Sequence, residues 1–538
     1  MQPQFNNSET LGSSLYIPYF KTLGRDKDLT FKPTFFEKFS KFEKDKYLLQ
    51  NEFRKKGKDY SLIADFAFLR GYNSAADNKT KNVNHLFLDY TKDFEIPNYI
   101  DNKLDIKIER VTNDTYLKVF QNVFPKSDFF QGGQTTLNSN VKWYLEEEDQ
   151  NLSSGIEIYE NLGAKTSDRY QYTLPYYNFS KDLTSIVSNS YFGGSLNFSS
   201  NGSNTLKNTN NLKTTISNNL NYSSMDFISD LGFKNNFNLH FQNFNAIGKN
   251  DPIYTSNTQI DGMGIVNFIT EYPLLKTKNT NRETLTPKMS LRINPFNNMN
   301  DFSDNSSIID ASNVFDINRL GINEYEAGKS ITLGLDYKFD LVEDFASEDI
   351  KDKYLEIKLG TVFREKNETD IPINSTINRK NSNIFGSINN NLFENIELGY
   401  QFSLDNDLKT LNSNTINTKI EVNNFITTFD FIETRNELGS THSISNETEY
   451  KVNDNTSLKF STRRNKEINL TEYYNLSYEY KNDCLTAALK FNKKFYKDGD
   501  LIPTEDLFFS ITLIPLTTYE RDIYKKTQGQ SGLKGWFR

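Results

Sequence analysis

The chain has 538 residues, a formal net charge of −8 and a hydrophobic content of 36%. No run approaches 18 apolar residues, which excludes a transmembrane helix, and the acidic balance without a basic stripe argues against a nucleic-acid partner. Aromatic residues reach 14%, with 30 Tyr and 43 Phe, which excludes a generally disordered chain.

The chain begins with two short strand-like runs in residues 1–20, and each carries a proline, Pro3 and Pro18. Proline cannot donate a hydrogen bond to a β-ladder, so it is expected at an edge or a weak seam of a sheet. Polar residues follow Met1 where a signal peptide would have a basic region and an apolar core. We therefore expect that a leader has been removed or that the sequence begins partway through a longer protein.

Two polar segments interrupt the first half of the chain. An acidic run at 146–149 follows Trp143 and Tyr144. Such a run is usually a solvated loop, although it could hold a divalent cation or steer a phosphorylated substrate. The Asn-rich segment 201–213 is predicted to be a long external loop.

The second half shows the clearest period-2 patterns, in residues 395–404, 472–480, 485–491 and 509–513. Segment 395–404 alternates apolar residues (Ile396, Leu398, Tyr400, Phe402 and Leu404) with polar residues or glycine. Because successive side chains of a strand point to opposite faces, each segment predicts a strand with one apolar and one polar face.

Such strands fit either a soluble sandwich or a membrane barrel that turns its apolar face to lipid. The patterns run through the whole chain without a linker, and their length of about ten residues suits a tilted membrane strand. A single soluble core of this size is unusual. We therefore predict one all-β domain over residues 1–538, a large transmembrane antiparallel barrel of about two dozen strands.

Catalytic and metal chemistry is not indicated. Cys484 is the only cysteine, so no disulfide forms within the chain, and His85, His240 and His442 are isolated in the sequence. We find no nucleophile–base pair and no phosphate-binding glycine loop. We expect no enzyme, no cofactor and no metal.

Six blocks of the chain, in order, resemble a known family, the lipopolysaccharide-assembly proteins of the Gram-negative outer membrane (LptD-like, organic solvent tolerance proteins). The blocks are Tyr16-Ile17-Pro18-Tyr19-Phe20; Asp28-Leu29-Thr30-Phe31-Lys32-Pro33; Asn51-Glu52-Phe53-Arg54; Asn113-Asp114-Thr115-Tyr116-Leu117; Leu285-Thr286-Pro287 with Asn294-Pro295-Phe296; and Phe315, Asn318-Arg319-Leu320, Glu326, Gly328 and Thr332-Leu333-Gly334-Leu335.

The resemblance implies a barrel of 26 strands in the bacterial outer membrane that inserts lipopolysaccharide into the outer leaflet. It further implies a small plug lipoprotein in the lumen (LptE-like) and periplasmic bridge proteins that dock on an N-terminal jelly-roll domain. Met1 falls about where that domain would end, so the chain resembles the barrel portion alone.

The resemblance also implies a lateral gate between the first and last strands. Pro3 and Pro18 match the family's two gate prolines, and the closing strand is expected at 507–514. The expected gate residues are therefore Pro3, Pro18, Phe509, Ile511, Leu513 and Pro515; the last is a third proline without a counterpart in the family pattern. Cys484 resembles a family cysteine that forms a disulfide with the jelly-roll domain, although it could equally be a small residue at a strand start.

Two other functions remain open from the sequence. One is a general porin or a plugged uptake-receptor barrel. The other is a secreted all-β adhesin or structural protein. Dependence on detergent would separate both barrels from the adhesin, and conductance without a partner would favour the porin.

Overall fold

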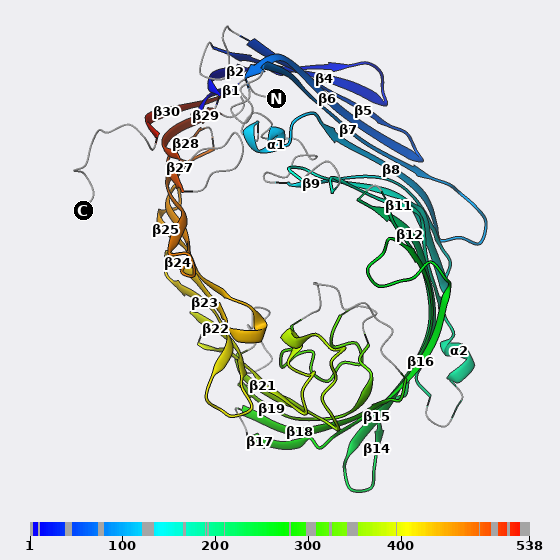
Figure 1. Cartoon of the computed structure of the whole chain (residues 1–538). Helices are drawn as coiled ribbons and strands as arrows, with labels where there is room; N and C mark the ends of the chain where they lie inside the picture. The colour runs from blue at the N-terminus through cyan, green and yellow to red at the C-terminus, as the bar shows by residue number, and fades with distance from the viewer. Residues whose placement is uncertain are drawn as a thin grey trace.

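The computed structural model describes the protein at residues 4–8, 11–37, 46–73, 80–120, 134–164, 168–188, 190, 193–208, 210–278, 281–296, 308–321, 325–341, 353–393, 395–483, 485–495, 504–513 and 517–527. Most of these residues belong to a single sheet, antiparallel except between β1 and β30, which Figure 1 shows as a ring. Among the described residues, no helix is long and apolar enough to cross a membrane.

The first half of the chain contains β1 (Gln4–Ser8), β2 (Gly12–Tyr16), β3 (Tyr19–Thr22), β4 (Lys27–Phe36), β5 (Lys46–Lys56), β6 (Tyr60–Asn73), β7 (Thr80–Asp93), β8 (Asp101–Val111), α1 (Tyr116–Val119), β9 (Thr136–Glu146), β10 (Gln150–Asn161), β11 (Tyr170–Asp182), α2 (Thr184–Val187), β12 (Ser195–Lys207), β13 (Asn211–Ser223), β14 (Phe227–Ile228), β15 (Lys234–Lys249), β16 (Gln259–Glu271) and β17 (Leu274–Lys278). The second half contains β18 (Asn281–Asn294), β19 (Gly328–Leu341), β20 (Lys353–Arg364), η1 (Ile373–Ser375), β21 (Asn381–Phe393), β22 (Ile396–Leu404), β23 (Leu411–Val422), β24 (Phe425–Thr434), η2 (Asn436–Leu438), β25 (Thr441–Asn453), β26 (Thr456–Asn465), β27 (Leu470–Lys481), β28 (Leu485–Lys494), β29 (Thr504–Leu513) and β30 (Thr517–Thr527).

The thirty segments make 27 strands around the barrel, because three of them continue a neighbour. β2 and β3 both pair with β4 and form one strand interrupted between them. β14 extends β13 along β15, and β17 extends β16 along β18. The predicted class, a very large antiparallel barrel, is confirmed, with one strand more than the 26 that the family resemblance implied.

The odd number of strands determines how the barrel closes. Consecutive strands alternate in direction, so the first and the twenty-seventh run the same way. β1 and β30 accordingly pair in parallel, with Gln4 opposite Thr518 and Phe5 opposite Tyr519. Figure 1 places these two strands beside each other, far apart in sequence but adjacent in the ring.

The strand faces are those of a membrane barrel. On β19, the outward Ile331, Leu333 and Leu335 are 42%, 43% and 37% exposed, whereas the inward Ser330 and Thr332 are 4% and 1% exposed. β27 likewise exposes Tyr474, Leu476 and Tyr478. Regularly spaced apolar side chains on the outer surface would be costly in water but are stabilised by lipid.

The two rims of the barrel differ. We call the rim toward which the chain start of β1 points the N rim; it carries tight connections such as 147–149, 423–424 and 454–455, and its longest connections are 183–194 and 342–352. The opposite rim, the loop rim, carries the longer connections 112–135, 295–327 and 365–380. The described parts of these three loops fold into the ring (Figure 1).

Three small hydrophobic clusters of described residues join the inward loops to the barrel wall, the smallest made by Tyr325 with Met263 and Ile265 of β16. The first contains Tyr116, Leu117, Val119 and Phe120 of the α1 loop, with wall residues that include Phe36 and Phe87. The second contains Ile309, Val314, Leu320, Ile371 and Ile377 of the other two loops, with Val362 and Phe385 of the wall.

Most of the predicted strands are confirmed, and two predictions about the chain path are wrong. Segments 395–404, 472–480, 485–491 and 509–513 lie in or along β22, β27, β28 and β29. Segment 201–213 is not a long loop, because β12 and β13 pair along it and leave only residues 208–210 between them. The closing strand is not 507–514 but β30, which follows it and pairs with both β29 and β1.

Candidate functional site: the seam and the inward loops

The contact between β1 and β30, which we call the seam, is the shortest junction between two neighbouring strands of the ring. Only two residue pairs align there, whereas β28 and β29, and β29 and β30, each align over ten. The two pairs lie at the first described residues of β1; on its other side, Gln4 faces Tyr16 in the middle of the second strand. Beyond Tyr519, no described residue of β30 aligns with one of β1, although Asn6 to Ser8 of β1 are described.

Pro18 lies in the second strand, at the interruption between β2 and β3. The register is continuous across it, since Tyr16 faces Thr34 and Tyr19 faces Phe31. The amide of Ile17 still donates to the Pro33 carbonyl at 3.1 Å, but Pro18 has no N–H to offer. Because successive amides of a strand point to opposite neighbours, the donor that Pro18 lacks is on the β1 side of the second strand, next to the seam.

A buried polar network lies on the inner wall next to this interruption. By register, Pro18 faces Lys32, whose ammonium binds Glu52 and lies 3.8 Å from Asp65. Asp65 also accepts from Gln50 at 2.8 Å and contacts His85 Nε2 at 3.0 Å. The network joins β4, β5, β6 and β7 on the lumen side.

His85 connects this wall to the α1 loop. Its Nδ1 lies 2.8 Å from the Tyr116 hydroxyl, and both side chains are almost fully buried. No local sequence pattern predicts this link, because Asp65, His85 and Tyr116 lie far apart in the chain. Only the register of β6 and β7, which places Ala67 opposite His85, brings them together.

The inward segment 308–321 packs against two glycines of the wall. Gly334 of β19 and Gly360 of β20 are directly paired. A Cβ on Gly334 would lie 2.6 Å from the Phe315 ring, and a Cβ on Gly360 would lie 2.7 Å from Val314 Cγ1. The missing side chains let Val314 and Phe315 approach the backbone of the wall closely.

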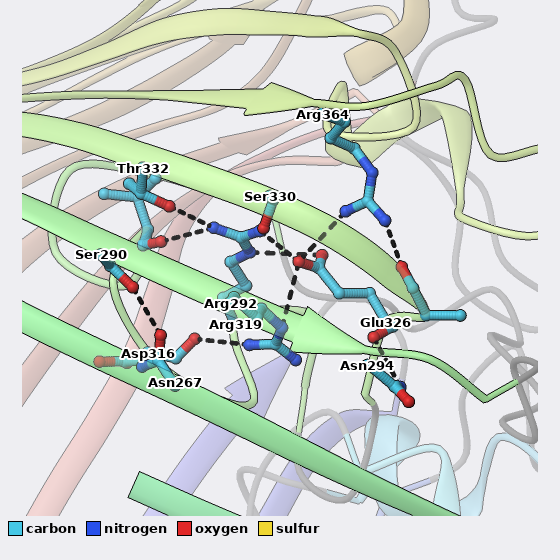
Figure 2. Close-up of polar contacts among 12 residues, drawn as sticks. Asn267, Ser290, Arg292, Asn294, Asp316, Arg319, Glu326, Ser330, Thr332 and Arg364 are labelled. Atoms are coloured by element: carbon cyan, nitrogen blue, oxygen red, sulfur yellow. Dashed lines mark hydrogen bonds and ion pairs between the residues drawn. The ribbon is translucent and has the colours of Figure 1, made fainter. Parts of the chain in front are cut away.

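Three arginines converge on a single carboxylate beneath this loop (Figure 2). Arg319 binds both oxygens of Glu326, while Arg364 and Arg292 reach Glu326 Oε1 at 3.2 and 3.4 Å. All four side chains are at most 4% exposed. The cluster fastens the loop to β18 and β20, since Arg292 and Arg364 belong to those strands.

Neutral groups complete the cluster. Arg319 donates to the Thr332 and Ser330 hydroxyls at 3.0 and 3.1 Å and to the Val314 carbonyl at 2.9 Å. Asn294 donates to the Glu326 backbone carbonyl at 3.0 Å. Burial alone would raise the pKa of the Glu326 carboxyl, but the charges of Arg319, Arg292 and Arg364 outweigh it and lower the pKa to about 2.

Four of the six predicted gate residues lie within the described residues. Pro18 lies beside the seam, and Phe509, Ile511 and Leu513 lie on β29, one strand away from it. Pro3, Pro515 and Cys484 lie outside the described residues. The acidic run 146–149 is the end of β9 and its turn to β10, as a solvated loop would be. Within the described ranges, no group of three or more His, Cys, Asp or Glu is placed to hold a metal.

These features define a class: a large antiparallel β-barrel of the outer-membrane type, with an apolar outer wall, inward-folded loops and one poorly paired seam.

Comparisons with known proteins give little beyond this class. No family model matches the chain, and no curated protein matches it. Among solved structures, it is similar to BauA, the ferric preacinetobactin receptor of Acinetobacter baumannii, with 7% identity over 92% of this chain and 74% of that one, and a TM-score of 0.24. It is also similar to the ferric-catecholate import receptor Fiu of E. coli K12, with 8% identity over 93% of this chain and 72% of that one, and a TM-score of 0.21.

Proposed function

We propose that this protein is an outer-membrane translocon that inserts lipopolysaccharide into the outer leaflet. The glycolipid enters the lumen at the N rim and leaves sideways between β1 and β30. The observation that carries the proposal is the seam, in which the described residues align only at Gln4–Thr518 and Phe5–Tyr519.

The short alignment of β1 with β30 supports sideways release. In lipid, an open sheet edge costs several kcal/mol for each unsatisfied backbone group, so membrane barrels normally close along their whole height. Among the described residues, the pairing is confined to the first two residues of β1, and β30 continues from there toward the loop rim without aligning with β1. The missing donor of Pro18 weakens the next strand as well, so this is where opening requires the least free energy.

The orientation of the barrel follows from its rims. Barrels of this type have short periplasmic turns and longer external loops. The N rim is accordingly periplasmic, and the part of β30 that does not align with β1 extends toward the outer leaflet. A glycolipid whose sugars travel in the polar lumen and whose acyl chains enter the bilayer would therefore be released into the outer leaflet.

The inward loops favour a sideways exit over passage straight through the barrel. Residues 308–321 are fixed in the lumen near the loop rim by the arginine cluster and by the glycine pair Gly334–Gly360. A lumen narrowed at its external end leaves the wall as the route for a bulky lipid. The partners that we propose are the plug lipoprotein inside the lumen and the periplasmic bridge proteins below it.

A disulfide across the seam tests the proposal. Phe5→Cys with Tyr519→Cys joins two residues that face each other, so a bond should form without backbone movement. We expect export of lipopolysaccharide to the cell surface to stop under oxidising conditions and to resume after reduction.

The matched control joins Leu476→Cys to Phe491→Cys, which face each other across the fully paired β27 and β28. This barrel should export normally in both redox states. Normal export by a barrel with a verified Phe5–Tyr519 cross-link would refute the lateral gate. Uptake of small solutes through such a cross-linked barrel would favour a porin or receptor instead.

A further inference from the structure

A pocket of about 530 Å³ opens on the lumen side of the wall, away from the seam and from the inward loops. Its side chains come from five consecutive strands, β20 to β24: they include Tyr354, Asn389, Glu397, Asn417, Lys419, Thr428 and Asp430. These residues lie near the ends of their strands at the N rim, where a transported molecule would enter.

Gly399 creates the hollow. On the inner face it stands between Asn389 of β21 and Asn417 of β23 in one cross-strand row. A Cβ on Gly399 would meet its nearest atom, Asn389 Oδ1, at 3.6 Å, which is an ordinary contact. The pocket is therefore open because one side chain is missing, and a larger residue could fill it without a backbone clash.

The lining consists of planar polar groups held in place by their neighbours. Asn417 donates to Asp430 Oδ1 at 2.8 Å, and Asn389 donates to Glu356 Oε2 at 3.4 Å. Each of these pairs retains further acceptor capacity toward the lumen. The Tyr354 ring adds a flat apolar surface to the same pocket.

The charges of the lining select against anions. Glu397 and Asp430 provide two carboxylates, whereas Lys419 provides one ammonium, which lies within 4.0 Å of Glu397 and 3.4 Å of Glu421. A phosphate would meet net negative charge here. Neutral hydroxyl groups could donate to the carboxylates and accept from the amides, as polar groups in a small-molecule site do.

We propose that this pocket binds a neutral saccharide segment on the lumen wall. The choice of a glycan rests on the proposed function, in which the sugars of the cargo pass through the lumen, while the pocket and its chemistry stand independently of that function. The site would hold uncharged sugar units near the periplasmic mouth and would leave phosphorylated units unbound.

Saturation-transfer NMR on the full chain, folded in a detergent without a sugar headgroup, tests the site with maltoheptaose as the probe. We expect signal transfer to maltoheptaose, and none to inositol hexakisphosphate at the same concentration. Gly399→Val, which fills the hollow, should reduce the transfer at least fivefold, and Asp430→Ala should reduce it as well.

Gly262→Val is the matched control. Gly262 lies on the outer face of β16, and its Cβ would meet only the Gln242 carbonyl oxygen, at 3.9 Å. This variant should bind as the parent does, and each variant is first shown to be folded by its heat-modifiable migration. Equal transfer in Gly399→Val and the parent, or equal transfer to the phosphate probe, would overturn the proposal.

The outcome is separate from that of the gate. The barrel cross-linked at Phe5 and Tyr519 should bind maltoheptaose as well as the reduced one. Binding that persists while the cross-linked barrel still exports would refute the gate alone. If the cross-linked barrel stops exporting but the parent barrel does not bind maltoheptaose, the pocket alone would be refuted.

Discussion

Replacing Glu326 with glutamine should release the inward loop 308–321 from the barrel wall. The variant keeps the shape of the side chain but leaves Arg292, Arg319 and Arg364 buried with no carboxylate between them. Removal of one partner from a buried ion pair costs about 3–5 kcal/mol. At about 1.4 kcal/mol per tenfold, the docked loop should lose at least about a hundredfold in its equilibrium constant.

Hydrogen exchange measured by mass spectrometry reports this loss directly. Amides of 308–321 should exchange at least about a hundredfold faster in Glu326→Gln, while those of β22 to β27 should be unchanged because these strands do not contact the cluster. The control is Glu365→Gln, whose partner Lys329 is 59% exposed. An exposed pair contributes about 0–1 kcal/mol, so protection of the loop should be preserved.

A second substitution tests the physical reason. If uncompensated charge is what destabilises the loop, Arg292→Met in the Glu326→Gln background should restore part of the protection. Parental protection of 308–321 in Glu326→Gln would refute the view that the arginine cluster holds the loop.

Three further predictions concern the loop and the outer wall. The pKa of Glu326 is lowered to about 2, so its contribution to loop docking should be complete above its ordinary pKa near 4.5 and should disappear as the pH falls from there toward 2. Hydrogen exchange of 308–321 measured across this pH range should show the transition. The Glu326→Gln variant should not show it. Gly360→Ala should cost about 1–3 kcal/mol by overpacking against Val314, and Val314→Ala should relieve most of that cost in a double-mutant cycle measured by exchange of the same loop. Leu333→Lys should destabilise the barrel in lipid vesicles by about 2–4 kcal/mol in urea unfolding, whereas Gln401→Lys on the lumen face should be nearly neutral; equal effects would argue against a lipid-facing outer wall.

The alternation of side chains could be predicted because it is local. In 395–404 the apolar residues fall on every second position, and β22 follows this pattern. The number of strands could only be approximated, because β2 and β3, which are separate segments, form one strand that is interrupted at Pro18. The closing strand could not be predicted from alternation, because β30 is rich in charged residues and shows little apolar alternation.

The inward loops and their anchors could not be predicted from local patterns. The resemblance grouped Phe315, Arg319, Glu326 and Thr332, but gave no physical reason for the grouping. The structure supplies one, since Phe315 rests on Gly334 while Arg319 joins Glu326 to Thr332. Arg292 and Arg364 enter the same cluster from other strands, through a register that no sequence window contains.

The most direct test of the proposed lateral route is to detect the cargo at the seam. A photo-crosslinking amino acid at Phe5, in cells that are exporting lipopolysaccharide, should yield an adduct between this protein and the glycolipid after irradiation. The same amino acid at Phe429, which is exposed on the outer face of β24, should yield much less. Equal adducts at Phe5 and Phe429, or none at Phe5 in cells with normal export, would contradict passage of the glycolipid between β1 and β30.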